Sequence, residues 1–382
     1  MTSACSAWVA GETSGDLIAA PVLREVQQRL GGVPGCGIGG PAMQAEGFNA
    51  LWSIDDLSVR GYTEVLAALP RLLKLRSDLT RELITRNPSV FVGVDAPDFN
   101  FRLEAKLKTA GIPTIHFIGP SVWAWRRERL ASIARSVNHM LLVFPFEKSL
   151  YDQAGIAATY VGHPMADEID PGGIDKATAR SKLGVSGEAP VVALLPGSRG
   201  SEIRYMGGLF FKVAKWLHSQ RSTVRFLVPA ATPALKLRLE QIARHEGIGD
   251  LLDLKVTDGQ VRDVLAAADT VLSASGTVTL ETALMQRPMV IAYRMSAISY
   301  QIMKRMAYLP YIGLPNILCD DWVVPEYVQD AASPAVLGSA ILEQLDDPVA
   351  CEHIVARFAD LRASLAIGCA SRAAQVIADH AS

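Results

Sequence analysis

The chain has 382 residues, which exceeds the usual size of one domain and predicts two. Apolar residues make up 49% of it and charged residues 20%, a composition that supports packed cores and excludes a largely disordered chain. The net charge of -2 argues against a protein that grips nucleic acid, and the five cysteines have neither metal-ligand spacing nor the even count of a disulfide framework.

Short apolar runs alternate with helical periodicity in the first half, which predicts a parallel sheet with crossover helices. The first strand, 4–9, is the least apolar of the set. The predicted strands that follow are 90–94, 114–118 and 139–143, and the predicted helices are 101–110 and 128–136.

An Asp-, Pro- and Gly-rich break at 167–176 is the predicted interdomain linker, because the same rhythm restarts after it. We therefore expect two Rossmann-like, doubly wound α/β domains that face a cleft, with ligands at the carboxyl ends of the strands. The second half has predicted strands at 191–195, 224–228, 254–256, 270–273 and 288–293, helices at 206–220 and 233–245, and a helical segment at 334–381.

No targeting or membrane-spanning segment is expected. Residues 1–10 lack the basic flank and long apolar stretch of a signal peptide, and no apolar run approaches membrane-spanning length. A cytoplasmic protein that meets a membrane only at its surface is therefore predicted.

Two loops of the second half have the residues that bind a nucleotide diphosphate. Each follows a predicted strand and begins a helix, so backbone amides can meet phosphate oxygens, an Arg can add a charged fork and a Glu can accept ribose hydroxyls. A plain strand-to-helix turn or a helix cap explains either loop alone, but two such loops favour nucleotide binding. The residues are Gly197, Ser198 and Arg199 in the first loop and Ser275, Gly276, Thr277 and Glu281 in the second.

Two carboxylates follow the strand at 90–94. One can act as a general base while the other caps the next helix. Asp98 lies just before that helix, so we assign it the cap and leave Asp95 for chemistry. The stretch 11–16, which includes Gly15, resembles a phosphate loop but lacks Gly-x-Gly-x-x-Gly spacing and the Walker lysine, and the cluster 37–41 supports a dinucleotide fingerprint only weakly.

Further candidates are aromatic and basic. Trp123 and Arg126 lie in a loop where they can stack on a sugar and bind phosphate, although a core tryptophan beside a solvated basic helix is the alternative. His163 is as much a structural candidate as a ligand-facing one. The stripe at 65–81 mixes large apolar residues with Arg and Lys, and an amphipathic core helix is its stronger interpretation.

Ten stretches carry a resemblance to a known family: 9–16 (VAGETSGD), 43–48 (MQAEGF), 92–100 (VGVDAPDFN), 120–126 (PSVWAWR), 145–148 (PFEK), 161–164 (VGHP), 194–202 (LLPGSRGSE), 274–281 (ASGTVTLE), 288–295 (PMVIAYRM) and 314–318 (LPNIL). In this order, over nearly the whole chain, they resemble the lipid-A-disaccharide synthases, glycosyltransferases of the GT-B fold. Single pieces are weakly specific, but the ordered set is strong. Gly119 departs from the pattern, since the family tends to carry Ser there.

The resemblance implies a hexosyltransferase with UDP-2,3-diacylglucosamine as donor and 2,3-diacylglucosamine 1-phosphate as acceptor, which gives lipid A disaccharide 1-phosphate and UDP. It implies peripheral contact with the inner membrane of a Gram-negative bacterium, and it leaves a homodimer open. No cofactor or metal ion is expected. The implied domains are 1–168, acceptor- and membrane-facing with helices 347–382 packing back on it, and 169–346, which binds the UDP-sugar.

The implied chemistry is one inverting displacement, since the donor is α-linked and the product β-linked. Asp95 is the expected base, and Arg199 with the amides after Ser275 would stabilise the departing diphosphate in place of a metal ion. Glu281 would fix the ribose. The expected substrate contacts are Gly15, Asp98, Trp123, Arg126, His163 and Asn316, the last in the LPN motif.

Other functions remain open on the sequence. A GT-B enzyme acting on a lipid-linked muropeptide would share the nucleotide loops, and a UDP-sugar 2-epimerase would share the fold without needing a lipid surface. A non-catalytic nucleotide-sugar binder would need Arg199 and Glu281 but not Asp95.

Overall fold

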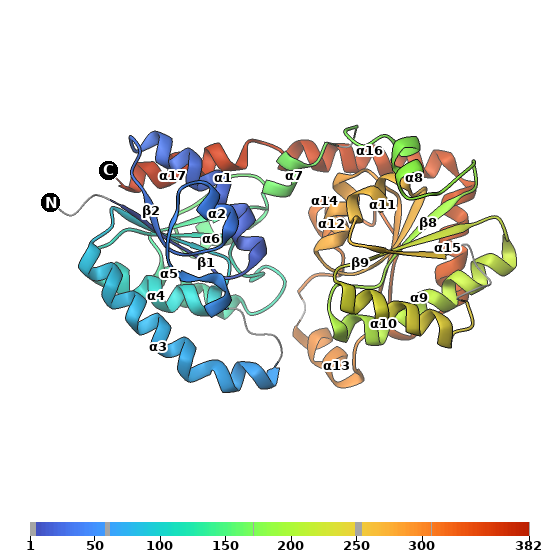
Figure 1. Ribbon diagram of the computed structural model, residues 1–382, viewed down its shortest axis with the longest axis horizontal. Helices are drawn as coiled ribbons and strands as arrows, with labels where there is room; N and C mark the ends of the chain where they lie inside the picture. The colour runs from blue at the N-terminus through green and yellow to red at the C-terminus, as the bar shows by residue number, and fades with distance from the viewer. Residues whose placement is uncertain (1–4, 58–61, 171, 249–253, 307, 382) are drawn as a thin grey trace. The chain divides into compact units, whose positions relative to one another are not determined.

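The chain forms two compact α/β units in the computed structural model, which describes residues 5–57, 62–170, 172–248, 254–306 and 308–381 (Figure 1). Within 62–68 it describes the course of the helix but not the side chains. Unit 1 comprises 1–167 and 365–382, and unit 2 comprises 168–364. The sequence placed the return to the first domain at Asp347, but α16 (Pro348–Leu365) lies almost wholly in unit 2 and the return comes at Leu365.

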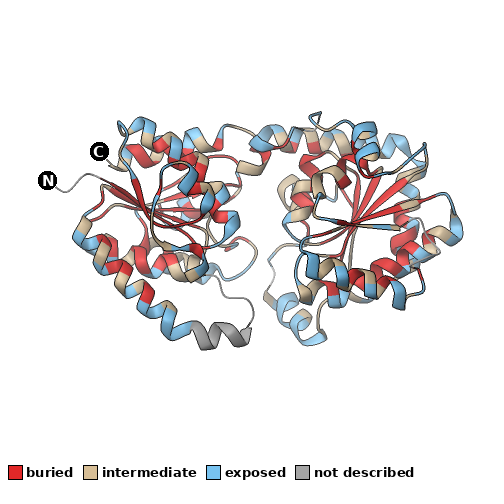
Figure 2. Cartoon of the chain, in the orientation of Figure 1, coloured by how far each residue is buried: buried red, intermediate tan, exposed pale blue. Residues whose placement is uncertain are grey.

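Unit 1 is built on a parallel sheet with the strand order β3-β2-β1-β4-β5-β6-β7. Its central strands are buried along their whole length, because helices cover both faces (Figure 2). The helices α1 and α17 pack side by side, and α3, α4 and α5 form a second layer. The strands are β1 (Ser6–Ala10), β2 (Gly35–Gly39), β3 (Asn49–Ser53), β4 (Val90–Val94), β5 (Thr114–Phe117), β6 (His139–Leu142) and β7 (Ala158–Tyr160). The helices are α1 (Thr13–Arg29), α2 (Pro41–Ala45), α3 (Tyr62–Arg86), α4 (Pro97–Thr109), α5 (Leu130–Ser136), α6 (Glu147–Gln153), α7 (Pro164–Glu168), α17 (Cys369–Ala381) and the 3-10 turns Ile54–Asp56 and Arg127–Arg129.

Unit 2 repeats the plan with a parallel sheet in the order β10-β9-β8-β11-β12-β13. The helix α9 packs against α10 and α15, while α11 packs against α8 and α12 against α14. The strands are β8 (Val191–Leu195), β9 (Arg225–Ala230), β10 (Leu254–Asp258), β11 (Thr270–Ala274), β12 (Met289–Tyr293) and β13 (Glu326–Val328). The helices are α8 (Lys176–Lys182), α9 (Gly200–Gln220), α10 (Pro233–His245), α11 (Val261–Ala267), α12 (Thr277–Leu284), α13 (Ala297–Met306), α14 (Leu314–Cys319), α15 (Pro334–Asp346), α16 and the 3-10 turn Gln329–Ala331.

Both sheets have a switch point, between β1 and β4 in unit 1 and between β8 and β11 in unit 2, where chain connections leave in opposite directions. Loops that follow these four strands cannot close over one another, which leaves room for a ligand beside them. The predicted motifs at 11–16, 95–100, 197–202 and 275–281 follow these four strands.

The glycine cluster at 37–41, which supports a dinucleotide fingerprint only weakly in the sequence, belongs mostly to the strand β2. Gly37 lies in β2 with φ of +136°, and a Cβ there would come 2.1 Å from the carbonyl oxygen of Trp8 in β1. Only glycine allows the two strands to pair at this spacing.

No helix in the described ranges is both long and apolar enough to cross a lipid bilayer.

Candidate functional site

A pocket of about 480 Å³ lies at the carboxyl ends of the neighbouring strands β10, β9, β8 and β11 in unit 2. Its walls come from loops that follow these strands. The structure brings together here all seven residues predicted to bind UDP: Gly197, Ser198, Arg199, Ser275, Gly276, Thr277 and Glu281.

The loop after β8 is shaped by Glu202, which the sequence did not single out. Its carboxylate accepts hydrogen bonds from the backbone amides of Ser198 (2.8 Å) and Arg199 (3.1 Å). Gly197 has φ of +120°, and a Cβ there would lie 2.5 Å from Glu202. The side chain of Arg199 is 79% exposed, and its Nη1 lies 3.4 Å from Glu202 Oε1. The expected phosphate-binding amides are thus already bonded to Glu202, so Arg199 is the group of this loop that can meet an anion.

The loop after β11 leaves a helix end open towards the pocket. In the described chain no side chain caps the N-terminus of α12, and a Cβ on Gly276 would meet nothing within 4 Å. The hydroxyl of Ser275 donates to the carbonyl of Ile312 (2.7 Å) and therefore holds the loop in place. Free amide groups at a helix N-terminus favour an anion, so a diphosphate fits beside Gly276 and Thr277.

Glu281 is engaged in an ion-pair chain that the sequence did not predict. Its Oε1 lies 3.3 Å from Nε of Arg262 in α11, and Nη2 of Arg262 lies 3.1 Å from Glu168. Burial raises the pKa of Glu281, and the charge of Arg262 opposes that shift. A basic residue soon after the strand at 254–256 was the available signal for Arg262, but its partner lies 19 residues later.

Asn316 is buried, contrary to the expectation that it touches a substrate at the surface of a cleft. Its Nδ2 donates to the carbonyl of Val324 and to Glu326, both at 2.8 Å, and its Oδ1 accepts from the amide of Val324 (3.0 Å). Glu326 also accepts from the amides of Ile312 (2.7 Å) and Gly313 (2.9 Å). Asn316 therefore fixes the loop that bonds to Ser275.

Asp95 begins the loop between β4 and α4, where it and Ala96 both adopt left-handed conformations, with φ of +51° and +45°. Its amide donates to the carbonyl of Phe117 (2.9 Å), and its own carbonyl accepts from Asn100 Nδ2 (2.8 Å). The residue is partly exposed, and within the described residues its carboxylate has no hydrogen-bond or ion-pair partner. A partner-free carboxylate on a held backbone can accept a proton.

Asp98 is not the cap of α4, which corrects that assignment. The N-cap is Ala96, without a side-chain cap bond, and Asp98 lies in the first turn of the helix. Its side chain is 89% exposed and pairs with Arg129 at 2.5 Å. A first-turn carboxylate interacts favourably with the helix dipole, which explains the residue type.

Gly15 lies buried in the first turns of α1, where a Cβ would sit 3.7 Å from both Ala10 and the carbonyl of Val94. Beside it, Asp16 is 1% exposed and accepts from the amides of Gly40 (2.8 Å), Ala42 (2.9 Å) and Met43 (3.1 Å). The stretch 11–16 therefore starts a helix and anchors α2, and the structure gives Gly15 a packing role.

The two tryptophans of residues 120–126 have different environments. Trp123 is 9% exposed and packs edge-on against Phe144 and Phe146, with ring centroids 6.3 and 5.3 Å away. Trp125 is 44% exposed, and the guanidinium of Arg126 lies 4.9 Å from its ring. Trp125, which we did not select, is therefore the one that presents a face to solvent, with Arg126 beside it.

Glu147 is bonded to the side chain of Trp123. Its carboxylate is 2% exposed and accepts from the Phe144 amide (3.1 Å) and from the side chain of Trp123. Burial raises the pKa of Glu147 to about 7, although these hydrogen bonds favour the charged form.

His163 packs in the same cluster, with its ring 5.5 Å from that of Phe144. Its Nδ1 accepts from the amide of Met165 (3.2 Å), and burial lowers its pKa to about 4. The ring is therefore neutral at neutral pH with its proton on Nε2, so it can donate a hydrogen bond there but cannot take up a proton.

Gly119, which was expected to depart from the family pattern, lies against Tyr151. A Cβ at this position would come 2.6 Å from the hydroxyl of Tyr151 and 2.8 Å from the methyl group of Met140. The buried Tyr151 and Met140 thus leave little room for a side chain at 119.

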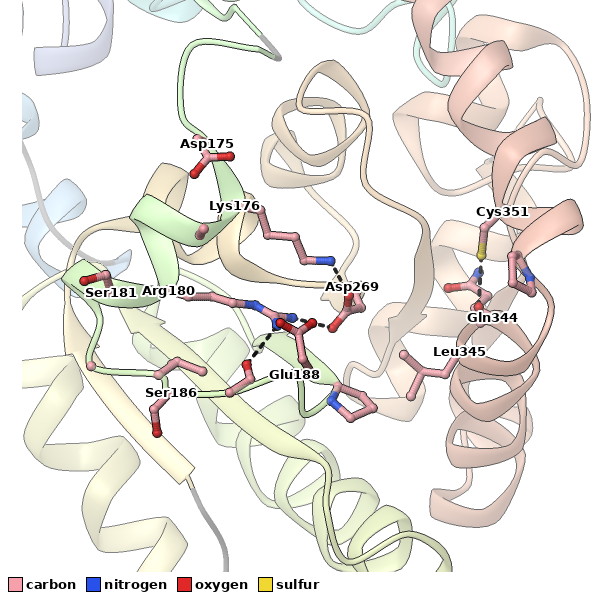
Figure 3. A pocket seen from close by; sticks show the side chains of 16 residues that line it. Asp175, Lys176, Arg180, Ser181, Ser186, Glu188, Asp269, Gln344, Leu345 and Cys351 are labelled. Atoms are coloured by element: carbon pink, nitrogen blue, oxygen red, sulfur yellow. Dashed lines mark hydrogen bonds and ion pairs between the residues drawn. The ribbon is translucent and has the colours of Figure 1, made fainter.

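A larger pocket of about 940 Å³ lies at the amino ends of the unit 2 strands, beside the residues that precede β8 and β11 (Figure 3). Lys176 and Arg180 converge there on Asp269, which also accepts from the amide of Val191 (2.7 Å). These charges satisfy one another and fix α8 to the sheet. No predicted site residue lines this pocket, so its size alone does not make it the functional site.

Comparisons with known proteins point to one family. The family model described as lipid-A-disaccharide synthetase matches residues 7–377. The lipid-A-disaccharide synthase of Paraburkholderia phytofirmans is 50% identical over 374 residues, which cover 97% of this chain and 95% of the relative. That of Azoarcus sp. (strain BH72) is 49% identical over 377 residues, which cover 98% and 96%.

Among solved structures, MurG of Acinetobacter baumannii aligns with a TM-score of 0.60 at 14% identity, covering 98% of this chain and 99% of that one. This likeness confirms the expected GT-B fold and shows the fold alone.

The raised pKa of Glu147 predicts that unit 1 loses stability as the pH rises. The folded state binds the proton more tightly than the unfolded chain, where the ordinary value is 4.5. This stabilisation is complete below pH 4.5 and disappears as the pH passes about 7. We expect the free energy of unfolding of the parent to fall by about 2–3 kcal/mol relative to Glu147→Gln between pH 4.5 and pH 8.

The measurement is urea unfolding followed by tryptophan fluorescence at several pH values. Ser149→Ala alters an exposed side chain of the same helix and keeps the carboxyl, so it should retain the pH dependence of the parent. Equal pH dependence in the parent and Glu147→Gln would show that this carboxyl does not titrate as described.

Proposed function

Because this chain belongs to the lipid-A-disaccharide synthase family of GT-B glycosyltransferases, we propose that it condenses UDP-2,3-diacylglucosamine with 2,3-diacylglucosamine 1-phosphate. The products are lipid A disaccharide 1-phosphate and UDP. The observation that carries the proposal is the pocket of unit 2, where an uncapped helix end, an exposed Arg and a carboxylate from the predicted loops meet.

The donor binds this pocket through its UDP part. The amides at the start of α12, beside Gly276 and Thr277, receive the diphosphate, and the guanidinium of Arg199 pairs with it. Glu281, which lines the same pocket, accepts hydroxyl groups of the ribose while Arg262 keeps it charged and oriented.

The reaction is a single displacement at the anomeric carbon. The primary hydroxyl of the acceptor attacks that carbon, the bond to the β-phosphate oxygen breaks, and UDP leaves with the bonding electrons. Asp95 takes the hydroxyl proton, and Arg199 with the α12 amides stabilises the charge that develops on the diphosphate. His163 is the weaker candidate for the base, because its Nδ1 accepts from the Met165 amide and its Nε2 already carries the proton.

Because both substrates carry acyl chains, we expect the enzyme to act at a membrane surface. The helix α13 is our candidate for the part that contacts the lipid. None of its residues is buried: Ile298 is 76% exposed, and Ile302 and Met303 are each 54% exposed. Lys304 and Arg305 follow on the same helix, a combination typical of a helix that lies in the lipid interface. In α3, Leu69 and Leu73 are exposed beside basic residues, while Val65 and Leu66 of that stripe lie outside the described side chains.

The first test is transfer itself, with Arg199 as the probe of the donor site. The parent should release UDP with the acylated acceptor in detergent micelles but not with UDP-N-acetylglucosamine and an unacylated acceptor. Arg199→Ala should lower kcat/KM by about 10²- to 10³-fold, the usual loss for one transition-state donor. Arg199→Lys should recover little, because an ammonium group cannot reproduce the planar fork.

Arg204→Ala is the matched control, since Arg204 is an exposed Arg of the same helix and lies outside the pocket. Near-normal turnover of a folded Arg199→Ala would remove Arg199 from the mechanism, and no transfer by the parent would overturn the proposed function.

The second test separates the two carboxylates of the β4–α4 loop. Asp95→Asn should lower kcat by roughly a hundredfold or more and leave UDP affinity unchanged, because it removes the proton acceptor in unit 1 only. Asp98→Asn should change kcat little and stability by less than about 1 kcal/mol, since it loses one exposed ion pair. Kinetics beside UDP titration calorimetry decides the matter; an inactive Asp98→Asn with an active Asp95→Asn would reverse the roles.

The third test concerns the membrane surface. Flotation with vesicles containing anionic lipid should decrease with added salt and with Met303→Glu or Leu69→Glu, because each places a carboxylate on an apolar, basic face. Leu237→Glu is the control, since Leu237 is 61% exposed and belongs to a different helix, α10. If both variants float like the parent and the control, neither helix contacts lipid.

A further inference from the structure

Three polar side chains lie completely buried beneath the loop that carries Asp95. Asn100 and Glu104 come from α4 and His116 from β5, and each has 0% exposure. His116 Nδ1 lies 2.8 Å from Glu104 Oε1, and the His116 ring packs 4.3 Å from that of Phe101. Burial raises the pKa of Glu104, and His116 opposes that shift. Burying two titratable groups and an amide costs folding free energy, so an apolar set would serve packing better.

Asn100 connects this cluster to the Asp95 loop. Its Nδ2 donates to the carbonyl of Asp95 at 2.8 Å and lies 3.4 Å from the carbonyl of Val9 and 3.5 Å from that of Val94. One amide group thus faces the ends of both β1 and β4 at the switch point of the sheet. Two consecutive left-handed residues, Asp95 and Ala96, persist only where neighbours hold them, and the Asn100 amide is such a neighbour.

Asn100 and Glu104 both pack over Gly93. A Cβ on Gly93 would come 2.2 Å from Glu104 Oε1 and 3.1 Å from Cβ of Asn100, so both side chains lie directly over this glycine. On the other side of the loop, a Cβ on Gly11 would come 2.4 Å from Cβ of Ala96. The loop therefore packs against Gly11 through Ala96 and is bonded to Asn100 through the carbonyl of Asp95.

We propose that Asn100 is a positioning residue for Asp95, and that Glu104, which is bonded to His116, supports it by packing beside it over Gly93. The inference rests on the proposed function, in which Asp95 is the base. Asn100 touches no substrate; it sets the direction of the carboxylate through the backbone of Asp95. A base displaced by a fraction of an ångström transfers the proton less well, while substrate binding is little affected.

The test is a double-mutant cycle between Asn100→Ala and Asp95→Asn. In the parent background, Asn100→Ala should lower kcat by about tenfold to a hundredfold, with KM for both substrates and UDP affinity within about twofold. In the Asp95→Asn background the same change should lower kcat by less than about twofold, since there is no base left to position. Glu104→Gln keeps the volume of the side chain and should show the same pattern with a smaller loss, which keeps the test valid if Asn100→Ala does not fold.

Thr114→Val is the matched control. Thr114 is buried at the other end of β5, where its hydroxyl donates to the Ser136 carbonyl (3.1 Å) and bonds to Asn138 (3.0 Å), so its loss destabilises unit 1 without touching the loop. It should leave kcat unchanged. If Asn100→Ala and Asp95→Asn multiply in effect, or if Asn100→Ala behaves like Thr114→Val, the positioning role is wrong while the base assignment stands. If Asp95→Asn turns over normally, the base assignment fails and this inference fails with it.

Discussion

Complete burial of the central parallel strands is the constraint on which the arrangement of the sites depends. Every residue of β1, β4, β8 and β11 is buried, so these strands have no room for a ligand-facing side chain. Polar side chains that could contact a ligand therefore lie in the loops that follow the strands. Parallel pairing brings these loops together at the carboxyl ends of the strands. The switch points then select the loops after β1, β4, β8 and β11.

Loops at such an edge need their own supports, and buried or half-buried carboxylates and amides provide them. Asp16 binds three amides at the start of α2, Glu202 binds two beside Gly197, and Glu326 binds two before α14. Asn100 and Asn316 use side-chain amides in the same way. Most polar residues near the sites therefore hold backbone, and few are left to meet a ligand: Asp95, Arg126 and Arg199 are the clearest.

Most of the strands and the loops after β8 and β11 could be predicted from the sequence, because apolar runs such as 90–94 and 191–195 and the Gly-Ser turns after them are local signals. The short strands β3, β7 and β13 were not predicted. The strand β2 could not be predicted, because its sequence GCGIG has poor strand propensity and exists as a strand only through close pairing with Trp8. The sequence could not show that Trp123 packs against Phe146 or that Asn316 bonds to Val324, because these contacts exist only in the folded chain. Both residues were therefore predicted to contact a ligand. Arg262 and Glu202 were missed for the same reason. Their roles depend on contacts with Glu281 and with the amides of the loop after β8, which the sequence does not show.

The charges of the donor pocket differ in how easily they can be redirected, and this difference assigns their roles. Arg262 lies between two carboxylates, Glu281 and Glu168, and moving it towards a phosphate would leave the mostly buried Glu281 without its counter-charge, a costly state. Arg199 is 79% exposed, and its 3.4 Å contact with Glu202 is an exposed ion pair of the kind worth at most about 1 kcal/mol. A diphosphate offers a stronger, bidentate partner, so Arg199 can leave Glu202 at little cost while the two amides keep Glu202 in place. In the proposed mechanism, Arg262 is therefore the fixed cation that orients the pocket carboxylate Glu281, and Arg199 is the one that can follow the leaving group as its charge develops.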